Sequence, residues 1–182
     1  FNNIGSAKAP KFQHKTNRFL GGLDLGSASA PVFADIDSDG DEDLFVGNEF
    51  NERLPGLRGT IFFFRNTGGS DSTLFILEDS TFFPELTGNN LVPAFGDLDQ
   101  DGDLDAIVGD WNGRLYKYTN YGTTSLFNFK YEGEFFDLDI GGLAHPTLGD
   151  LDLDGDVDLL VGNNLGKIFY WENLGSLNVS EF

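Results

Sequence analysis

The sequence predicts an all-β protein built from three consecutive four-stranded antiparallel sheets, and three observations support this prediction. The 182 residues include 24 Gly and 19 Phe but few strong helix formers, a composition that favours strands and tight turns. One pattern of sequence occurs three times along the chain. Each occurrence contains short apolar or aromatic segments separated by Gly, Asn and Asp, as expected for antiparallel β structure.

Two independent markers set the period of this repeat. An aspartate-rich loop begins at Asp35, Asp97 and Asp150, which are 62 and 53 residues apart. The second marker is an asparagine two residues before a glycine, with intervals of 63, 54 and 53 residues. Since the two markers give matching periods, the chain is a repeat protein. The asparagines are Asn3, Asn66, Asn120 and Asn173.

The predicted strands of a repeat follow one another in a fixed order. The first strand begins at a proline, at 31–36, 93–98 and 146–151. The second follows the aspartate-rich loop, at 43–48, 105–110 and 158–163. The third lies at 60–66, 114–120 and 167–173, and the fourth at 73–83 and 127–136. Four strands at intervals of 53 to 63 residues is the spacing of β-propeller blades, small twisted sheets that stack face to face.

We therefore predict a partial propeller of three blades, at 31–92, 93–145 and 146–182, the last with an incomplete fourth strand. Residues 1–30 would supply a terminal strand, at 9–20, that completes a neighbouring blade, followed by a connection. A bare sheet edge invites pairing. Completion by another copy would give a two-fold six-bladed ring or an open chain of copies, and the alternative is a longer array of repeats. The chain begins at Phe1 without a methionine, which indicates a processed chain or an excerpt.

Half of the 30 acidic residues lie in the three loops, which share the spacing D-x-D-x-D-G-D-x-D. Calcium takes roughly six to eight oxygen ligands, and alternate residues of a tight turn can point at one centre. We predict one Ca²⁺ per loop, held by side chains at positions 1, 3, 5 and 9 and by the backbone carbonyl of position 7, whose aspartate would point outward. Glycine at position 6 permits the positive φ of the turn. The candidate metal residues are Asp35, Asp37, Asp39, Asp41, Asp43, Asp97, Asp99, Asp101, Asp103, Asp105, Asp150, Asp152, Asp154, Asp156 and Asp158.

Without a cation these loops are unfavourable. Two carboxylates about 4–5 Å apart repel by roughly 3–4 kcal/mol at an effective dielectric constant near 20. The summed repulsion of several such pairs exceeds the usual free energy of unfolding of a domain, about 5–15 kcal/mol. A solvated acidic turn is the alternative for one loop, but three copies with glycine in register argue against it. An EF-hand needs glutamate at position 12 and flanking helices, whereas position 12 is Val46, Val108 or Val161. Numerous ligands from one flexible loop favour calcium over magnesium.

The stretch "PAFGDLDQDGDLDAIVGD" at 93–110 and its two counterparts resemble VCBS/FG-GAP repeats, the calcium-loop blades of integrin α-subunit propellers and of many secreted proteins. The resemblance covers nearly all of the chain and implies that the loop joins the first and second strands of a blade. It also implies an extracellular or cell-surface protein that acts in adhesion, sugar binding or assembly. Propellers of this family usually close with about seven blades, so three would not close a ring.

A second candidate surface lies in the turns between the second and third strands, at the end opposite the loops. Trp111, with Asn112 and Arg114, is the best candidate for stacking a sugar ring, and packing between blades is its alternative role. The insertion at 48–60 adds Arg53 and Arg58 to an otherwise acidic chain. The leading hypothesis is a secreted, calcium-stabilised adhesion or assembly protein. Its alternatives are a lectin and a non-catalytic part of a polysaccharide-degrading enzyme.

The remaining features indicate what we do not expect. A net charge of −19 repels phosphate, so we do not expect nucleic acid or an anionic membrane surface as a partner. No stretch approaches about 18 apolar residues, so we do not expect membrane insertion. No Ser-His-Asp arrangement, phosphate-binding loop or thiol nucleophile is present, and nearly all of the paired carboxylates belong to the loops, so we predict no catalysis. We interpret Trp171 and the pre-proline His145 as structural residues. The sequon at Asn178 is a weak glycosylation signal.

Overall fold

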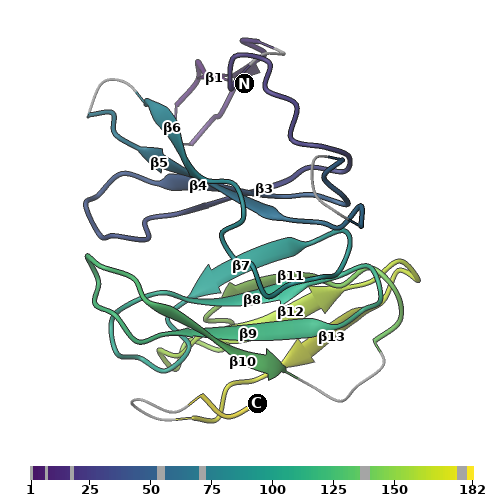
Figure 1. Cartoon of the computed structure of the whole chain (residues 1–182). Helices are drawn as coiled ribbons and strands as arrows, with labels where there is room; N and C mark the ends of the chain where they lie inside the picture. Colours follow the sequence, from purple (N-terminus) through teal and green to yellow (C-terminus); the bar gives the residue numbers. More distant parts are fainter. Residues whose placement is uncertain are drawn as a thin grey trace.

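The computed structural model describes residues 2–6, 8–16, 19–52, 56–69, 73–135, 140–175 and 180–182. Within these ranges the chain is all β, in three antiparallel sheets and one separate hairpin (Figure 1), which confirms the predicted class. Over the same ranges no helix is long and apolar enough to cross a membrane. The strands are β1 (Asn2–Asn3), β2 (Phe12–Gln13), β3 (Ala30–Ala34), β4 (Asp43–Gly47), β5 (Ile61–Asn66), β6 (Phe75–Asp79), β7 (Val92–Gly96), β8 (Asp105–Gly109), β9 (Leu115–Asn120), β10 (Phe129–Glu134), β11 (His145–Gly149), β12 (Asp158–Gly162) and β13 (Ile168–Trp171).

The three sheets share one topology, in which strands that follow one another in sequence are paired. The first sheet is β3-β4-β5-β6, the second is β7-β8-β9-β10, and the third is β11-β12-β13. Both four-stranded sheets carry an irregularity at the same place, which leaves Glu78 and Glu132 outside the regular pairing with the third strand. Two sheets therefore have the predicted four strands and one has three, and the described residues form no closed ring of sheets.

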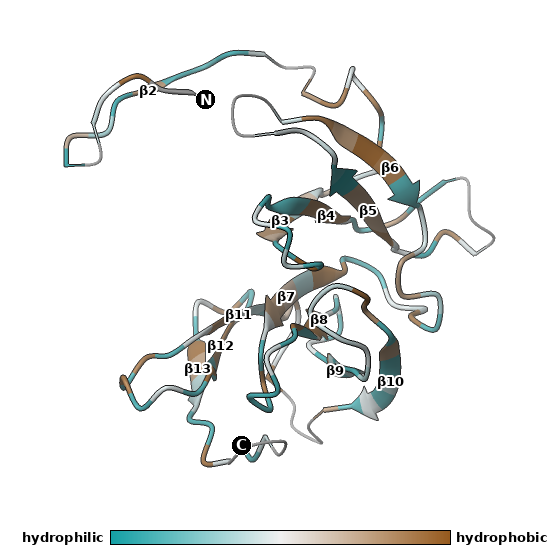
Figure 2. Cartoon of the chain, turned by 90° about the vertical axis from the view of Figure 1, so that its left-hand side faces the viewer, coloured by the Kyte–Doolittle hydropathy of each residue, from teal (hydrophilic) through white to brown (hydrophobic). Residues whose placement is uncertain are grey.

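The first two sheets pack through both of their faces, because successive side chains of a strand point to opposite sides. Phe45 and Phe63 stack with ring centroids 4.8 Å apart, and Phe45 meets Phe95 of the second sheet at 4.3 Å. The opposite face of the second sheet places Ile107 against the apolar residues of the third sheet, among them Leu159. In Figure 2, β5 and β7 carry much of the hydrophobic colour. Sheets covered on two sides explain why the strands are continuous apolar runs.

Two glycines allow successive sheets to approach closely. A Cβ added to Gly47, the last residue of β4, would lie 1.9 Å from the carbonyl oxygen of Leu91. A Cβ at the corresponding Gly109 would lie 2.2 Å from the carbonyl oxygen of Ala144. The N–H groups of Leu91 and Ala144 each donate, at 2.9 Å, to the carbonyl of the residue that follows the glycine. The connection into each new sheet is therefore fixed against the end of the preceding one.

The N-terminal segment forms a hairpin in which β1 pairs with β2. Among the described residues of the strand predicted at 9–20, which are 9–16 and 19–20, only Phe12 and Gln13 form a strand. In Figure 2 the hairpin stands apart from the three sheets. Its closing bond, from the N–H of Ile4 to the carbonyl of Lys11 at 2.7 Å, recurs after Asn66, Asn120 and Asn173 at 2.7 to 3.0 Å. The asparagine marker of the sequence thus corresponds to one turn that occurs four times.

Candidate metal centre

Each aspartate-rich loop joins the first strand of a sheet to the second, as the sequence predicts. The loops cover 35–42, 97–104 and 150–157 and lie at the same end of the three sheets, at the left of Figure 1. The glycines at position 6, Gly40, Gly102 and Gly155, have φ angles of 94°, 98° and 100°. A residue with a Cβ is strained in this region, so the predicted role of these glycines is confirmed.

The aspartate at position 1 folds the loop around its own carboxylate. Asp35 accepts hydrogen bonds from the N–H of Asp39 at 3.1 Å and of Gly40 at 3.0 Å. The corresponding aspartate of the second loop accepts the same two bonds at 3.1 and 3.0 Å. In the third loop Asp150 accepts from Gly155 at 3.2 Å. A carboxylate oxygen has two lone pairs, so each of these groups can still ligate a cation.

The aspartates at positions 1, 3 and 5 converge in every loop. Each of the three offers an oxygen atom, and these oxygens lie within 4.8 Å of one another. Calcium–oxygen bonds are about 2.3–2.6 Å long, so two ligands of one ion lie at most about 5 Å apart. The observed spacing meets this requirement without rearrangement. The three groups are Asp35, Asp37 and Asp39; Asp97, Asp99 and Asp101; and Asp150, Asp152 and Asp154.

Buried carboxylate oxygens without a hydrogen-bond donor provide an independent test of whether a cation fits. Such oxygens belong to Asp37 and Asp43 in the first loop, Asp103 in the second and Asp156 in the third. An unpaired buried charge is strongly unfavourable. Burial raises the pKa of Asp43, Asp103 and Asp156 to about 6. It raises that of Asp105, which begins β8, to about 7. This set of hard, unneutralised oxygens fits a divalent cation of the calcium type.

The predicted outward orientation of the position-7 aspartate is wrong for two loops. Asp103 and Asp156 are each only 6 % exposed. Position 7 lies in the bend that precedes the second strand, and its backbone N–H donates at 3.1 Å to the position-5 aspartate, Asp101 or Asp154. This bend keeps the position-7 side chain close to the other carboxylates of the loop, and not in solvent. In the first loop Asp41 is partly exposed.

Position 9 has a structural role that the sequence prediction missed. Asp105 accepts a hydrogen bond from the N–H of Asn120 at 2.8 Å, and the side-chain oxygen of Asn120 accepts from Gly122 at 3.1 Å and Asn128 at 2.7 Å. This Asp–Asn brace ties the loop to the end of the third strand and to the next turn. The equal 15-residue separations of Asp105 from Asn120 and of Asp158 from Asn173 were the signal for it. The other two braces are Asp43 with Asn66 at 2.7 Å and Asp158 with Asn173 at 3.0 Å.

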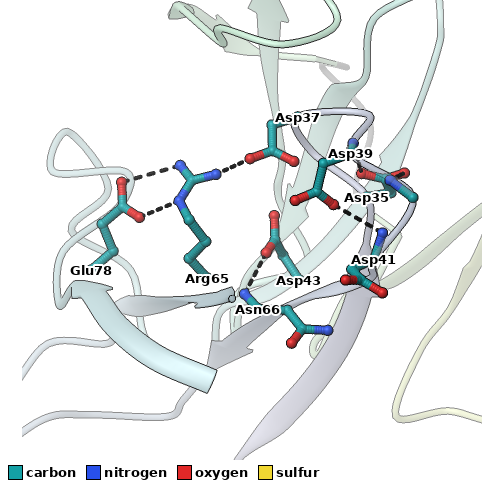
Figure 3. A network of polar contacts seen from close by, with 9 residues as sticks. Asp35, Asp37, Asp39, Asp41, Asp43, Arg65, Asn66 and Glu78 are labelled. Carbon is teal, nitrogen blue, oxygen red and sulfur yellow. Dashed lines mark hydrogen bonds and ion pairs between the residues drawn. The ribbon is translucent and has the colours of Figure 1, made fainter. Parts of the chain in front are cut away.

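An arginine outside the first loop contacts it, which the sequence prediction also missed. Arg65 lies near the end of β5 and forms ion pairs with Asp37 of the loop and with Glu78 of β6 (Figure 3). The Glu78 carboxylate accepts bonds from the guanidinium Nε at 2.5 Å and Nη2 at 3.2 Å. Glu78 is the residue left unpaired by the irregularity between β5 and β6, and such bulges redirect side chains.

The turns at the opposite end place the second set of candidate residues. Trp111 is 50 % exposed, and its backbone bonds to Asn89 at 2.8 Å and to Leu143 at 2.9 Å. The neighbouring Asn112 and Arg114 are also exposed, and Arg114 forms an ion pair with Glu134 at 3.2 Å. Buried Asp110 holds this turn by accepting the N–H of Asn112 at 2.8 Å and of Arg114 at 2.9 Å.

The other predicted residues have less defined surroundings. Arg58 is partly exposed, whereas Arg53 and Asn178 lie outside the described residues. Trp171 is partly buried and stacks on Phe169 with centroids 5.8 Å apart, in agreement with a packing role. His145 begins β11 in extended conformation.

Comparison with known protein families identifies the repeat. A family model described as "FG-GAP-like repeat" matches residues 35–108 and 97–161, and each match contains two aspartate-rich loops or large parts of them. A search of curated proteins finds no match. The two matched segments together span residues 35–161, well over half of the 182-residue chain. The chain belongs to the FG-GAP-like repeat family.

Proposed function

We propose that this protein is a calcium-stabilised extracellular repeat protein with a structural or adhesion role, in which each loop binds one Ca²⁺. The observation that carries the proposal is the presence in all three loops of buried carboxylate oxygens without a donor, beside three converging aspartates. The aspartates at positions 1, 3 and 5 would hold the ion, and those at positions 7 and 9 would complete the negative environment. The bound ion would neutralise the loop. FG-GAP repeats are typical of extracellular proteins, which supports secretion.

Melting curves with and without calcium test this proposal. At a thousand times its Kd, a ligand adds about 4 kcal/mol per site, so three sites add about 12 kcal/mol. With about 2–4 °C per kcal/mol for a chain of this size, chelation should lower Tm by tens of degrees. Asp101→Ala should remove about a third of this gain and weaken the second repeat most. Glu52→Ala, an exposed acid outside the loops, is the matched control. Identical curves in chelator and in calcium would refute calcium binding.

We further propose that the sheets stack as blades of a propeller and that their outer faces are covered by another copy of the chain or by further repeats. The two sheet-to-sheet contacts repeat, and the same positions are uncovered on the outer face of the third sheet. Ile61 and Phe63 are buried against the second sheet, whereas the corresponding Ile168 and Tyr170 are 76 % and 47 % exposed. Light scattering in calcium should detect association of the 182-residue chain. A stable monomer would contradict completion by a second copy.

A glycan-binding role is the second candidate, and the exposed Trp111 favours it. An exposed indole beside Asn112 is suited to stacking on the apolar face of a sugar ring, with polar groups at its edge. A glycan array with Trp111→Ala as the comparison tests this role. Tyr121→Ala, which removes an exposed aromatic residue from another turn, should leave binding unchanged. Both roles are non-catalytic, and the absence of any glycan signal would leave the adhesion or assembly role as the proposal.

A further inference from the structure

One loop differs from the other two because a protein cation already contacts it. Arg65 pairs with Asp37, the aspartate at position 3 of the first loop, while Glu78 holds the rest of the guanidinium group. The guanidinium carbon also lies 5.3 Å from the ring centroid of Phe63 and 5.9 Å from that of Phe127. These four contacts fix the positive charge beside the loop, with 27 % of the side chain exposed.

The corresponding positions of the other repeats carry no positive charge. They are Thr119 in the second repeat and Glu172 in the third, each directly before the asparagine of the turn. The nearest cation of the second repeat, Lys117, donates to Ser180, and no ion pair joins it to a loop aspartate within the described ranges. Among the residues that the structure describes, an arginine paired with a loop carboxylate is thus particular to the first repeat.

The two carboxylate oxygens of Asp37 have different surroundings. Its Oδ2 contacts Arg65, whereas its Oδ1 is buried and has no hydrogen-bond partner. The same carboxylate belongs to the group of three oxygens within 4.8 Å of one another. A metal ion bound by that group would therefore lie close to the guanidinium charge, on the other side of a single carboxylate.

We propose that Arg65 is a built-in competing cation that lowers the calcium affinity of the first loop and neutralises this loop when calcium is absent. The inference rests on the proposed function, since it concerns how the three calcium loops differ. A fixed positive charge repels an incoming divalent ion and withdraws charge from the carboxylate that both contact. The second loop has only the more distant charge of Lys117, which forms no ion pair with it, so within the described residues the second and third loops depend more on calcium than the first. As calcium falls, the first loop should release its ion while keeping its folded shape.

Nuclear magnetic resonance can measure each loop separately in the intact chain. The N–H groups of Gly40, Gly102 and Gly155 each donate to the position-1 aspartate of their own loop, at 3.0 to 3.2 Å. Their amide signals therefore give one calcium-binding curve per loop. Arg65→Gln should raise the affinity reported by Gly40 roughly tenfold and leave the other two curves unchanged. Competition titrations with a calcium chelator of known affinity extend the range to tight sites.

Two further variants separate charge from folding effects. Glu78→Gln removes the partner that compensates Arg65, so it should lower the affinity of the first loop several-fold, the opposite of Arg65→Gln. Lys130→Gln removes one positive charge from an exposed pair with Glu132 in the second sheet and should change none of the curves. Opposite shifts in the two test variants, confined to Gly40, support the proposal.

The calcium-binding curves distinguish a failure of the Arg65 proposal from a failure of calcium binding itself. If the signals of Gly102 and Gly155 do not respond to calcium, calcium binding itself is refuted. If they respond but Arg65→Gln leaves the Gly40 curve unchanged or moves it to weaker binding, Arg65 is not a competitor. Weaker binding would instead show that Arg65 orients Asp37 for the ion, which overturns the proposal.

Discussion

Acidification should stabilise the calcium-free protein, although acid weakens most proteins. Burial raises the pKa of Asp105 to about 7, far above the ordinary value of 3.8. The hydrogen bonds that its carboxylate accepts from the N–H groups of Asn120 and Leu98 lower the pKa and offset this rise only in part. The fold therefore prefers the protonated carboxyl group. Its stabilising effect is complete below the unfolded-state pKa and is lost as the pH rises through about 7.

The size of the effect follows from proton linkage. For Asp105 alone, the free energy of unfolding should fall by about 3 kcal/mol between about pH 5 and pH 8. In a chain of this length that change corresponds to about 5–10 °C in Tm. The raised pKa values of Asp43, Asp103 and Asp156, each about 6, act in the same direction.

Circular dichroism melts across this pH range, in buffer freed of calcium by a chelating resin, provide the assay. Repulsion among all the acidic groups of the chain also lowers stability as the pH rises, so Asp105→Asn serves as the control. This variant should reduce the change in the free energy of unfolding by about 3 kcal/mol, the value assigned to Asp105. In saturating calcium the slope should reverse, because protons and calcium compete for the same carboxylates. A calcium-free profile that is flat, or that rises toward pH 8, would refute the assignment of a buried unneutralised carboxylate.

Three further predictions concern the scaffold that carries the loops. Gly109→Ala should lower the free energy of unfolding, measured in urea, by more than about 2 kcal/mol, because the added Cβ would lie 2.2 Å from a carbonyl oxygen. Gly162→Ala, whose Cβ would have no atom within 4 Å, should lower it by less than about 1 kcal/mol. Asn120→Ala should lose about 2 kcal/mol by the same measurement, because two N–H groups lose their acceptor; a loss below about 0.5 kcal/mol would contradict the brace. Phe45→Ala, at a fully buried ring, should cost about 3–5 kcal/mol, and equal losses for this variant and the 55 % exposed Phe33→Ala would show that the sheets do not pack as described.

The features that repeat are those that could be predicted from the sequence. A loop that occurs three times with glycine in register restricts the backbone strongly, so the positions of the loops and the order of the strands follow from Gly40 and its counterparts. The apolar runs predict strands because a strand covered on both faces has few polar positions. The orientation of Asp103 was predicted wrongly, since it depends on the bend in which Asp103 donates its N–H to Asp101, a local geometry that spacing alone does not fix.

Features present in a single repeat could not be predicted in the same way. Arg65 reaches Asp37 across 28 positions of sequence, through the pairing of β4 with β5 and an irregularity that turns Glu78 toward it. No periodic signal points to such a contact, because the other repeats have Thr119 and Glu172 at that place. The Asp–Asn braces lie between these cases: both residues repeat, but their hydrogen bond depends on strand register.

All three aspartate loops lie at one end of the sheets, so the negative charge of the molecule is concentrated at that end (Figure 1). Half of its acidic groups lie in these loops, while Trp111 and Arg114 lie at the far end. Facing a positively charged surface, the ion-free chain would be drawn end-on, loops first, with the tryptophan turned away from the surface. Three divalent ions would neutralise six negative charges at the loop end and weaken this alignment. Ions bound in the loops would therefore change the orientation of the molecule on a charged surface as well as its stability.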